Sequence, residues 1–247
     1  MGIDMVKMRC ELLKVEGAFN VRDIGGYVAV SGAQVRKRRF IRADSLSGLT
    51  ARGKDDILGL GVRCVVDLRS DAEVTRQPDA IAGHPQVDYH HIPMLDYIQS
   101  SMVSGDFTSF PTSMAGMYTG LLDSAQAQLL RVFQVLADPA RERVLFHCTA
   151  GKDRTGVVAM LLLSLAGVDD DTIAEDYSWS ELLLPPMMSG GFSHSPDVPG
   201  YLARSSPESM LAALGHLHEV YGGARTYLQK IGLSAGELDQ LLHKLIA

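Results

Sequence analysis

The chain has 247 residues, 46% of them hydrophobic, and a formal net charge of −6 at pH 7. This length and composition suit a single domain over residues 1–247 with a substantial core. The negative charge argues against nucleic acid as a partner. Three cysteines, an odd number, argue against a disulfide framework, and no apolar run is long enough for stable insertion into a membrane.

The first 15 residues lack the apolar block of a signal peptide. We therefore expect a cytoplasmic protein, and secretion without a cleavable signal stays open as the alternative. Further along the chain, apolar runs bounded by turn residues predict strands. The expected strands are Tyr27–Val30, Arg38–Ile41, Val62–Leu68, Val87–Ile92 and Val144–His147.

Helical spacing and capping residues predict helices between these strands. The expected helices are Thr50–Leu60, Met114–Ala137, Thr155–Ala166, Asp170–Leu184, one that begins at Ser206, and one that begins at a Ser234/Glu237 capping box. Strands that alternate with helices indicate an α/β fold, with a largely parallel central sheet flanked by helices. Ligands of such sheets bind at the carboxyl ends of the strands. Segments 96–113 and 187–206 show no strong periodicity, and we expect both to cover the mouth of a site.

The loop after the last predicted strand carries the clearest chemical signal. Cys148 and Arg154 enclose five residues, and the flanking sequences read as a strand before the loop and a helix after it. A loop that wraps into a helix N-terminus points several N–H groups at one place, which favours an anion and a thiolate there. Arg154 supplies a planar fork for two phosphoryl oxygens. The pattern predicts a phosphate held against a sulfur nucleophile, with no metal or cofactor needed.

The predicted reaction assigns a role to each residue of the loop. Cys148 should attack phosphorus to form a cysteinyl-phosphate. The remaining members of the predicted phosphate-binding set are Thr149, Ala150, Gly151, Lys152 and Thr155. A general acid must then protonate the leaving oxygen. Two carboxylates compete for this role, Asp153 within the loop and Asp96 after a predicted strand.

The string Phe146–Gly156 resembles the signature loop of protein tyrosine phosphatases, and its Gly-Lys-Asp-Arg-Thr-Gly part is similar to the bacterial PtpB-like family of tyrosine/serine phosphatases. Three further segments resemble boxes of that family: Asn20–Gly26, Arg42–Leu46 (with Ala43 in place of the usual serine) and Asp67–Glu73. The region Tyr221–Leu233 resembles its C-terminal helices. Ordered matches along most of the chain are harder to obtain by chance than a single motif.

The resemblance implies a tyrosine phosphatase fold with a helical lid, and hydrolysis of phosphotyrosine and phosphoserine/threonine. Some members of the family also hydrolyse phosphoinositides, so phosphorylated proteins and phosphoinositides are the expected substrates and inorganic phosphate is the product. The family's acid is the loop aspartate, which favours Asp153 over Asp96. Lys152 is a candidate for binding a second phosphate of the substrate, such as one on an inositol ring, and a solvated lysine is the alternative.

Residues beside the loop have weaker interpretations. His147 is expected to orient the loop backbone rather than to act as a base. Asp67 and Arg69 stand at the end of a predicted strand, where a structural ion pair is favoured over ordering of the loop or contact with substrate. The basic run Arg36–Arg39 is expected to be a solvated face rather than a lipid-binding surface, and Cys64 is expected in the core.

Two other classes of function compete with a phosphatase. A sulfurtransferase or an arsenate reductase can use a similar loop, but an arsenate reductase needs further thiols, for which Cys10 and Cys64 are poorly placed. A binding module that captures phosphorylated partners without turnover is the other rival. The presence of Cys148, Asp153 and Arg154 together argues against it.

Overall fold

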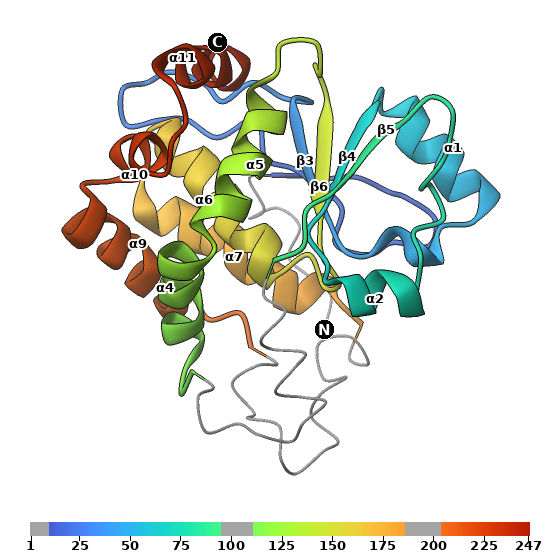
Figure 1. The fold of residues 1–247 in the computed structure, drawn as a ribbon, viewed down its shortest axis with the longest axis horizontal. Coiled ribbons are helices and arrows are strands. Elements are labelled where there is room, and N and C mark those ends of the chain that lie inside the picture. Colours follow the sequence, from blue (N-terminus) through green and yellow to red (C-terminus); the bar gives the residue numbers. More distant parts are fainter. Residues whose placement is uncertain (1–9, 95–110, 186–203) are drawn as a thin grey trace.

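A computed structural model gives the fold over residues 10–94, 111–185 and 204–247 (Figure 1). Its sheet has the order β1-β2-β3-β6-β4-β5. The strands are β1 Glu11–Leu12, β2 Arg22–Asp23, β3 Phe40–Ala43, β4 Cys64–Asp67, β5 Asp88–His91 and β6 Val144–His147. Strands β3, β6, β4 and β5 run parallel, whereas β1 and β2 pair antiparallel at one edge. The predicted α/β fold with a largely parallel sheet is confirmed.

Helices lie on both faces of the sheet (Figure 1). One face carries the short helix η1 Leu46–Gly48 and α1 Ala51–Gly59, and α2 Asp71–Arg76 follows β4. The other face carries the larger group: α4 Met114–Ser124, α5 Gln126–Ala137, α6 Asp153–Leu165, α7 Asp170–Leu183, α9 Pro207–Tyr221, α10 Ala224–Lys230 and α11 Ala235–Leu245. Among the described residues, no helix combines the length and the apolar character that crossing a bilayer requires.

Strand β6 occupies the middle of the sheet and is buried on both faces. Val144 and Phe146 belong to the larger core beneath α6, and Leu145 belongs to the smaller core beneath α1. Alternate side chains of a strand point to opposite faces, so an unbroken apolar strand is what two buried faces require. Burying each of these side chains contributes about 1.5–3 kcal/mol. The strand is thereby fixed, and so is the point where its carboxyl end delivers the chain into the loop.

Several predicted boundaries agree with the structure. The Thr50 side chain accepts from the Gly53 N–H and caps α1, and the Ser234/Glu237 capping box begins α11. The predicted strand Tyr27–Val30 is wrong, because this segment forms only one isolated bridge, Val28 to Gln34. The expected helix over Met114–Ala137 is two helices, α4 and α5, which meet at Ala125.

Three short elements, β1, β2 and α2, were not predicted from the sequence. Most of the expected covering segments 96–113 and 187–206 lies outside the described residues, as does Asp96. The helical lid and the single-domain organisation remain predictions.

Candidate active site

The loop Cys148–Lys152 joins β6 to α6 at the carboxyl end of the parallel strands. Cys148 is 2% exposed at the start of this loop. The pairing of β6 with β3 and β4 places His147 opposite Ala43 on one side and Asp67 on the other. Residues from both neighbouring strands are therefore within reach of the loop, and each side holds a different part of it.

The carbonyl groups of the loop are engaged one after another. The Thr149 carbonyl accepts from the Ser45 N–H at 3.0 Å, and the Ala150 carbonyl accepts from the Asn20 side-chain amide at 3.0 Å. The Gly151 carbonyl accepts from Asn20 and, at 2.9 Å, from Arg42 Nη2. No described residue accepts from the N–H groups of Thr149, Ala150 or Gly151. Because its carbonyl groups are hydrogen-bonded to neighbouring residues, the loop leaves these N–H groups for an anion.

A buried cluster supports the loop from the side of β2 and β3. Arg22 donates to the Asn20 side-chain oxygen, and both Arg22 and Arg42 pair with the Asp176 carboxylate of α7. Tyr27 donates to the same carboxylate at 2.9 Å. Burial opposes ionisation of Asp176, but the charges of Arg42 and Arg22 hold its pKa below the usual range. We call these residues, Asn20, Arg22, Tyr27, Arg42 and Asp176, the arginine cluster.

Gly151 allows this close approach. Its φ is +62°, a backbone conformation that costs little only for glycine. A Cβ atom at this position would lie 2.4 Å from the Ala43 carbonyl oxygen. The glycine therefore lets the loop rest directly on the end of β3.

Side chains of the loop are held from the opposite side, by α2. Ser70 and Glu73 form a capping box at the start of this helix. The Glu73 carboxylate also accepts from Arg154, with Nη1–Oε2 at 2.6 Å and Nη2–Oε1 at 2.8 Å, and from the Thr149 hydroxyl. Burial opposes ionisation of Glu73, but Arg154 outweighs it and lowers the pKa to about 2. Glu73 thus fixes the plane of the guanidinium.

A second buried cluster lies behind the end of β6. Arg69 pairs with Asp67 and Asp79, at 2.7 Å in each case, and Tyr89 donates to both carboxylates. His147 Nε2 lies 2.8 Å from Asp79 Oδ2, and its Nδ1 lies 3.2 Å from the Cys148 carbonyl oxygen. Burial disfavours the charged imidazole, but the two aspartates raise its pKa to about 9. His147 is therefore an imidazolium at neutral pH, and these five residues form the histidine cluster.

Asp153 stands at the start of α6, with its side chain 25% exposed. Tyr118 of α4 donates to Asp153 Oδ1 at 2.7 Å, and Lys152 Nζ lies 3.6 Å from the same atom. Lys152 also donates to the Arg204 carbonyl at 3.1 Å. Thr155 is fully buried, and its hydroxyl has no hydrogen-bond partner among the described residues.

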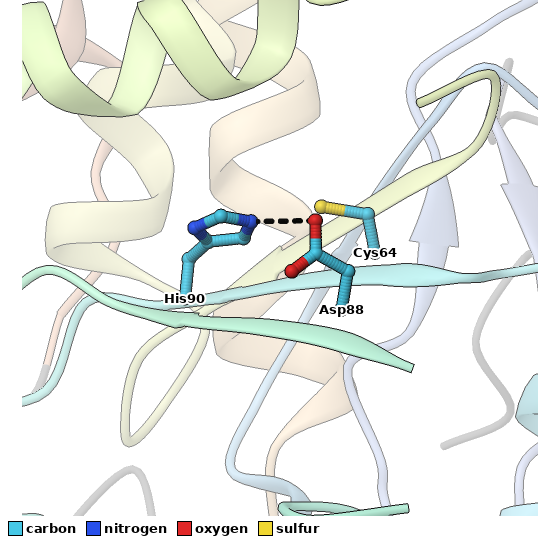
Figure 2. A group of neighbouring side chains, drawn as sticks. All are labelled: Cys64, Asp88 and His90. Atoms are coloured by element: carbon cyan, nitrogen blue, oxygen red, sulfur yellow. Dashed lines mark hydrogen bonds and ion pairs between the residues drawn. The ribbon is translucent and has the colours of Figure 1, made fainter. Parts of the chain in front are cut away.

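Within the described parts of the chain, two groups of side chains have the spacing of metal ligands. Asp67, Asp79 and His147 form one, but there the positive charges of Arg69 and protonated His147 already balance the two carboxylates. Figure 2 shows the other, Cys64, Asp88 and His90, at the opposite end of the strands. Its Asp88 carboxylate accepts from His90 at 2.9 Å and from Arg141 Nε at 2.8 Å. Burial raises the pKa of the Cys64 thiol to about 12.

The basic run Arg36–Arg39 was expected to be a solvated face, but three of its four side chains pair within the protein. Arg36 donates to the Ile246 carbonyl, Arg38 pairs with Glu11, and Arg39 pairs with Glu142. The contacts of Glu73, Tyr118 and Asp176 with the site were missed. The pattern Ser70-x-x-Glu73 was a visible capping signal, but nothing in the sequence joins Tyr118 of one helix to Asp153 of another.

Comparison with known proteins gives consistent matches. The tyrosine phosphatase family profile matches residues 13–247. A tyrosine-protein phosphatase of Nostoc commune is 38% identical over 213 residues, which covers 82% of this chain and 72% of that protein. Triple specificity protein phosphatase PtpB of Mycobacterium tuberculosis is 30% identical over 278 residues, with 92% and 96% covered. A putative tyrosine-protein phosphatase of Cupriavidus necator is 30% identical over 167 residues, with 64% and 59% covered.

Proposed function

Because this chain belongs to the tyrosine phosphatase family, its reaction is hydrolysis of a phosphate monoester, and we propose that it proceeds through a cysteinyl-phosphate. The observation that carries the proposal is the loop whose carbonyls are tied to Asn20, Arg42 and Ser45 while its N–H groups are left for an anion. Cys148 starts this loop, and Arg154 follows it in the first turn of α6. Both the nucleophile and the charge stabilisation that phosphoryl transfer needs are thereby supplied.

In the first step, the Cys148 sulfur attacks phosphorus, the S–P bond forms and the bond to the leaving oxygen breaks. Asp153 gives its proton to that oxygen. In the second step, Asp153 takes a proton from water, the water oxygen attacks phosphorus, and the S–P bond breaks to release inorganic phosphate. The Thr155 hydroxyl, buried without a described partner, is proposed to donate to the sulfur as it leaves.

The test is turnover of para-nitrophenyl phosphate. Cys148→Ser should abolish turnover and retain phosphate binding, whereas activity near that of the wild type would refute the nucleophile. Asp153→Asn should lower kcat/KM more for substrates with poor leaving groups than for substrates with good ones, because kcat/KM reports the first step and only poor leaving groups need the proton there. If Asp96→Asn shows that dependence instead, Asp96 is the acid.

We propose a broad substrate range, which includes phosphoserine and phosphothreonine. The relative PtpB, whose name gives it triple specificity, aligns with 92% of this chain. The alternative substrate is a phosphoinositide, for which Lys152 at the loop supplies a second cation. Rates with a phosphotyrosine peptide, a phosphoserine peptide and phosphoinositide vesicles would rank the three, and turnover of phosphotyrosine alone would contradict the broad range.

The rival reactions need chemistry that the described residues do not favour. An arsenate reductase relay requires a reactive thiol besides Cys148, and the other cysteines of the chain are Cys10 and Cys64. Burial raises the pKa of Cys10 to about 11 and that of Cys64 to about 12, so both are protonated at neutral pH. A thiol relay through either cysteine is therefore disfavoured.

A further inference from the structure

Two tyrosines from different helices meet at Asp153. Tyr118 comes from α4 and Tyr177 from α7, and both rings are buried. The rings pack edge to face, with centroids 5.6 Å apart and an angle of 80° between their planes. Their hydroxyls are in contact, and the Tyr118 hydroxyl is 2.7 Å from Asp153 Oδ1.

Each tyrosine hydroxyl has one proton to donate, and this decides which hydroxyl donates to which. Burial and the charge of Asp153 raise the pKa of Tyr118 well above its ordinary value, so its hydroxyl keeps its one proton. That proton is donated to Asp153 Oδ1, and the contact between the tyrosines therefore requires Tyr177 to donate to Tyr118. The order of donation is Tyr177 to Tyr118 to Asp153.

We propose that Tyr118 is a positioning residue for the general acid. It occupies Oδ1 of Asp153, so the proton that reaches the leaving group is carried on Oδ2, and it fixes the orientation of the carboxyl group. Tyr177 fixes the Tyr118 hydroxyl in turn. This inference rests on the proposed role of Asp153 and adds to it which oxygen acts and what holds it.

The residues around Tyr177 and Asp153 are consistent with this arrangement. A Cβ atom at position 156 would lie 3.2 Å from the Tyr177 ring, so Gly156 makes room for the ring beside α6. The cations that face Asp153 are Lys152, 3.6 Å from Oδ1, and Arg154, whose charge interacts with it. Both cations, Tyr118 and the N-terminus of α6 favour the ionised carboxylate, so removing the Tyr118 hydroxyl removes one of these contributions.

The test is Tyr118→Phe, which deletes the hydroxyl and keeps the ring. With a poor leaving group such as phenyl phosphate, kcat should fall about tenfold while KM changes little. The limb of the kcat–pH profile on which activity falls with rising pH should move to higher pH, because the ionised carboxylate has lost a donor. Tyr177→Phe should lower kcat and move this pH limb in the same directions, but by less.

Tyr227→Phe is the matched control. Tyr227 of α10 donates at 2.7 Å to the Leu122 carbonyl of α4, the helix that also carries Tyr118, but no contact joins Tyr227 to Asp153. It should leave the leaving-group dependence and the pH limb unchanged. In an Asp153→Asn background, Tyr118→Phe should have no further effect on kcat.

Two outcomes separate this inference from the proposed function. If Asp153→Asn shows the expected leaving-group dependence but Tyr118→Phe shifts neither quantity, or still lowers kcat in the Asp153→Asn background, the role of Tyr118 is wrong and that of Asp153 stands. If Asp153→Asn shows no such dependence, the acid assignment fails and the Tyr118 inference fails with it. Neither outcome bears on Cys148.

Discussion

The two sides of the loop are held by different means. The arginine cluster donates to backbone carbonyls of Ala150 and Gly151 through Asn20 and Arg42. On the side of β4 and α2, the Glu73 carboxylate holds the Arg154 guanidinium, and His147 of the histidine cluster lies with its Nδ1 3.2 Å from the Cys148 carbonyl oxygen. Arginine charges are permanent, whereas the charge of His147 depends on pH. One side therefore sets where the N–H groups point, and the other orients the guanidinium.

Removing one carboxylate from each cluster sharpens this contrast most. Asp176→Asn leaves Arg22 and Arg42 buried with no described carboxylate in ion-pair distance, so the free energy of unfolding should fall by about 3–5 kcal/mol. Asp79→Asn should cost less, about 1–3 kcal/mol, because His147 can release its proton and restore the balance with Asp67 and Arg69. Urea unfolding at pH 7 measures both, and equal losses would contradict the difference between the clusters.

Gly151→Ala attacks the contact between the loop and β3. The positive φ and the Cβ that would lie 2.4 Å from the Ala43 oxygen should lower the free energy of unfolding by about 1–3 kcal/mol and weaken competitive inhibition by phosphate. Gly236→Ala is the control, since a Cβ there meets nothing within 4 Å and α11 should gain about 0.5–1 kcal/mol. If Gly151→Ala changed neither the free energy of unfolding nor the inhibition by phosphate, the close contact between the loop and β3 would be contradicted.

The histidine cluster should make stability depend on pH. Folding raises the pKa of His147 from 6.5 to about 9, so its stabilising effect is complete below about pH 6.5 and is lost as pH rises through about 9. Between those pH values the free energy of unfolding of the wild type should fall by on the order of 1–3 kcal/mol relative to that of His147→Gln, as measured by urea unfolding at each pH. If the free energies of the two proteins change with pH in parallel, His147 is neutral in the folded protein.

Glu73→Gln tests the grip on Arg154. Loss of a hydrogen-bonded charge partner should lower kcat/KM about 10- to 100-fold. Glu237→Gln is matched to it, because both glutamates sit in capping boxes and only Glu73 reaches the site. Equal activity of the two variants would mean that Arg154 needs no support from α2.

How much of this follows from the sequence depends on whether a contact is local. The loop from Cys148 to Arg154, the strand before it and the helix after it are contiguous, so their order and chemistry are readable. The Asn20 box was recognised, but its contact with the Ala150 carbonyl joins residues 130 apart, which only the pairing of β2, β3 and β6 brings together. Tyr27–Val30 was assigned to a strand on local pattern alone, although the sheet offers that segment no partner strand beyond one bridge.

The most direct test of the account is to trap the intermediate. In Asp153→Asn, para-nitrophenyl phosphate should still phosphorylate the enzyme, because its leaving group needs no acid, while hydrolysis of the intermediate lacks its base. Rapid acid quench and peptide mass analysis should find one phosphoryl group on Cys148. Continued turnover with no phosphoryl group on that cysteine, or with the group on another residue, would contradict the account.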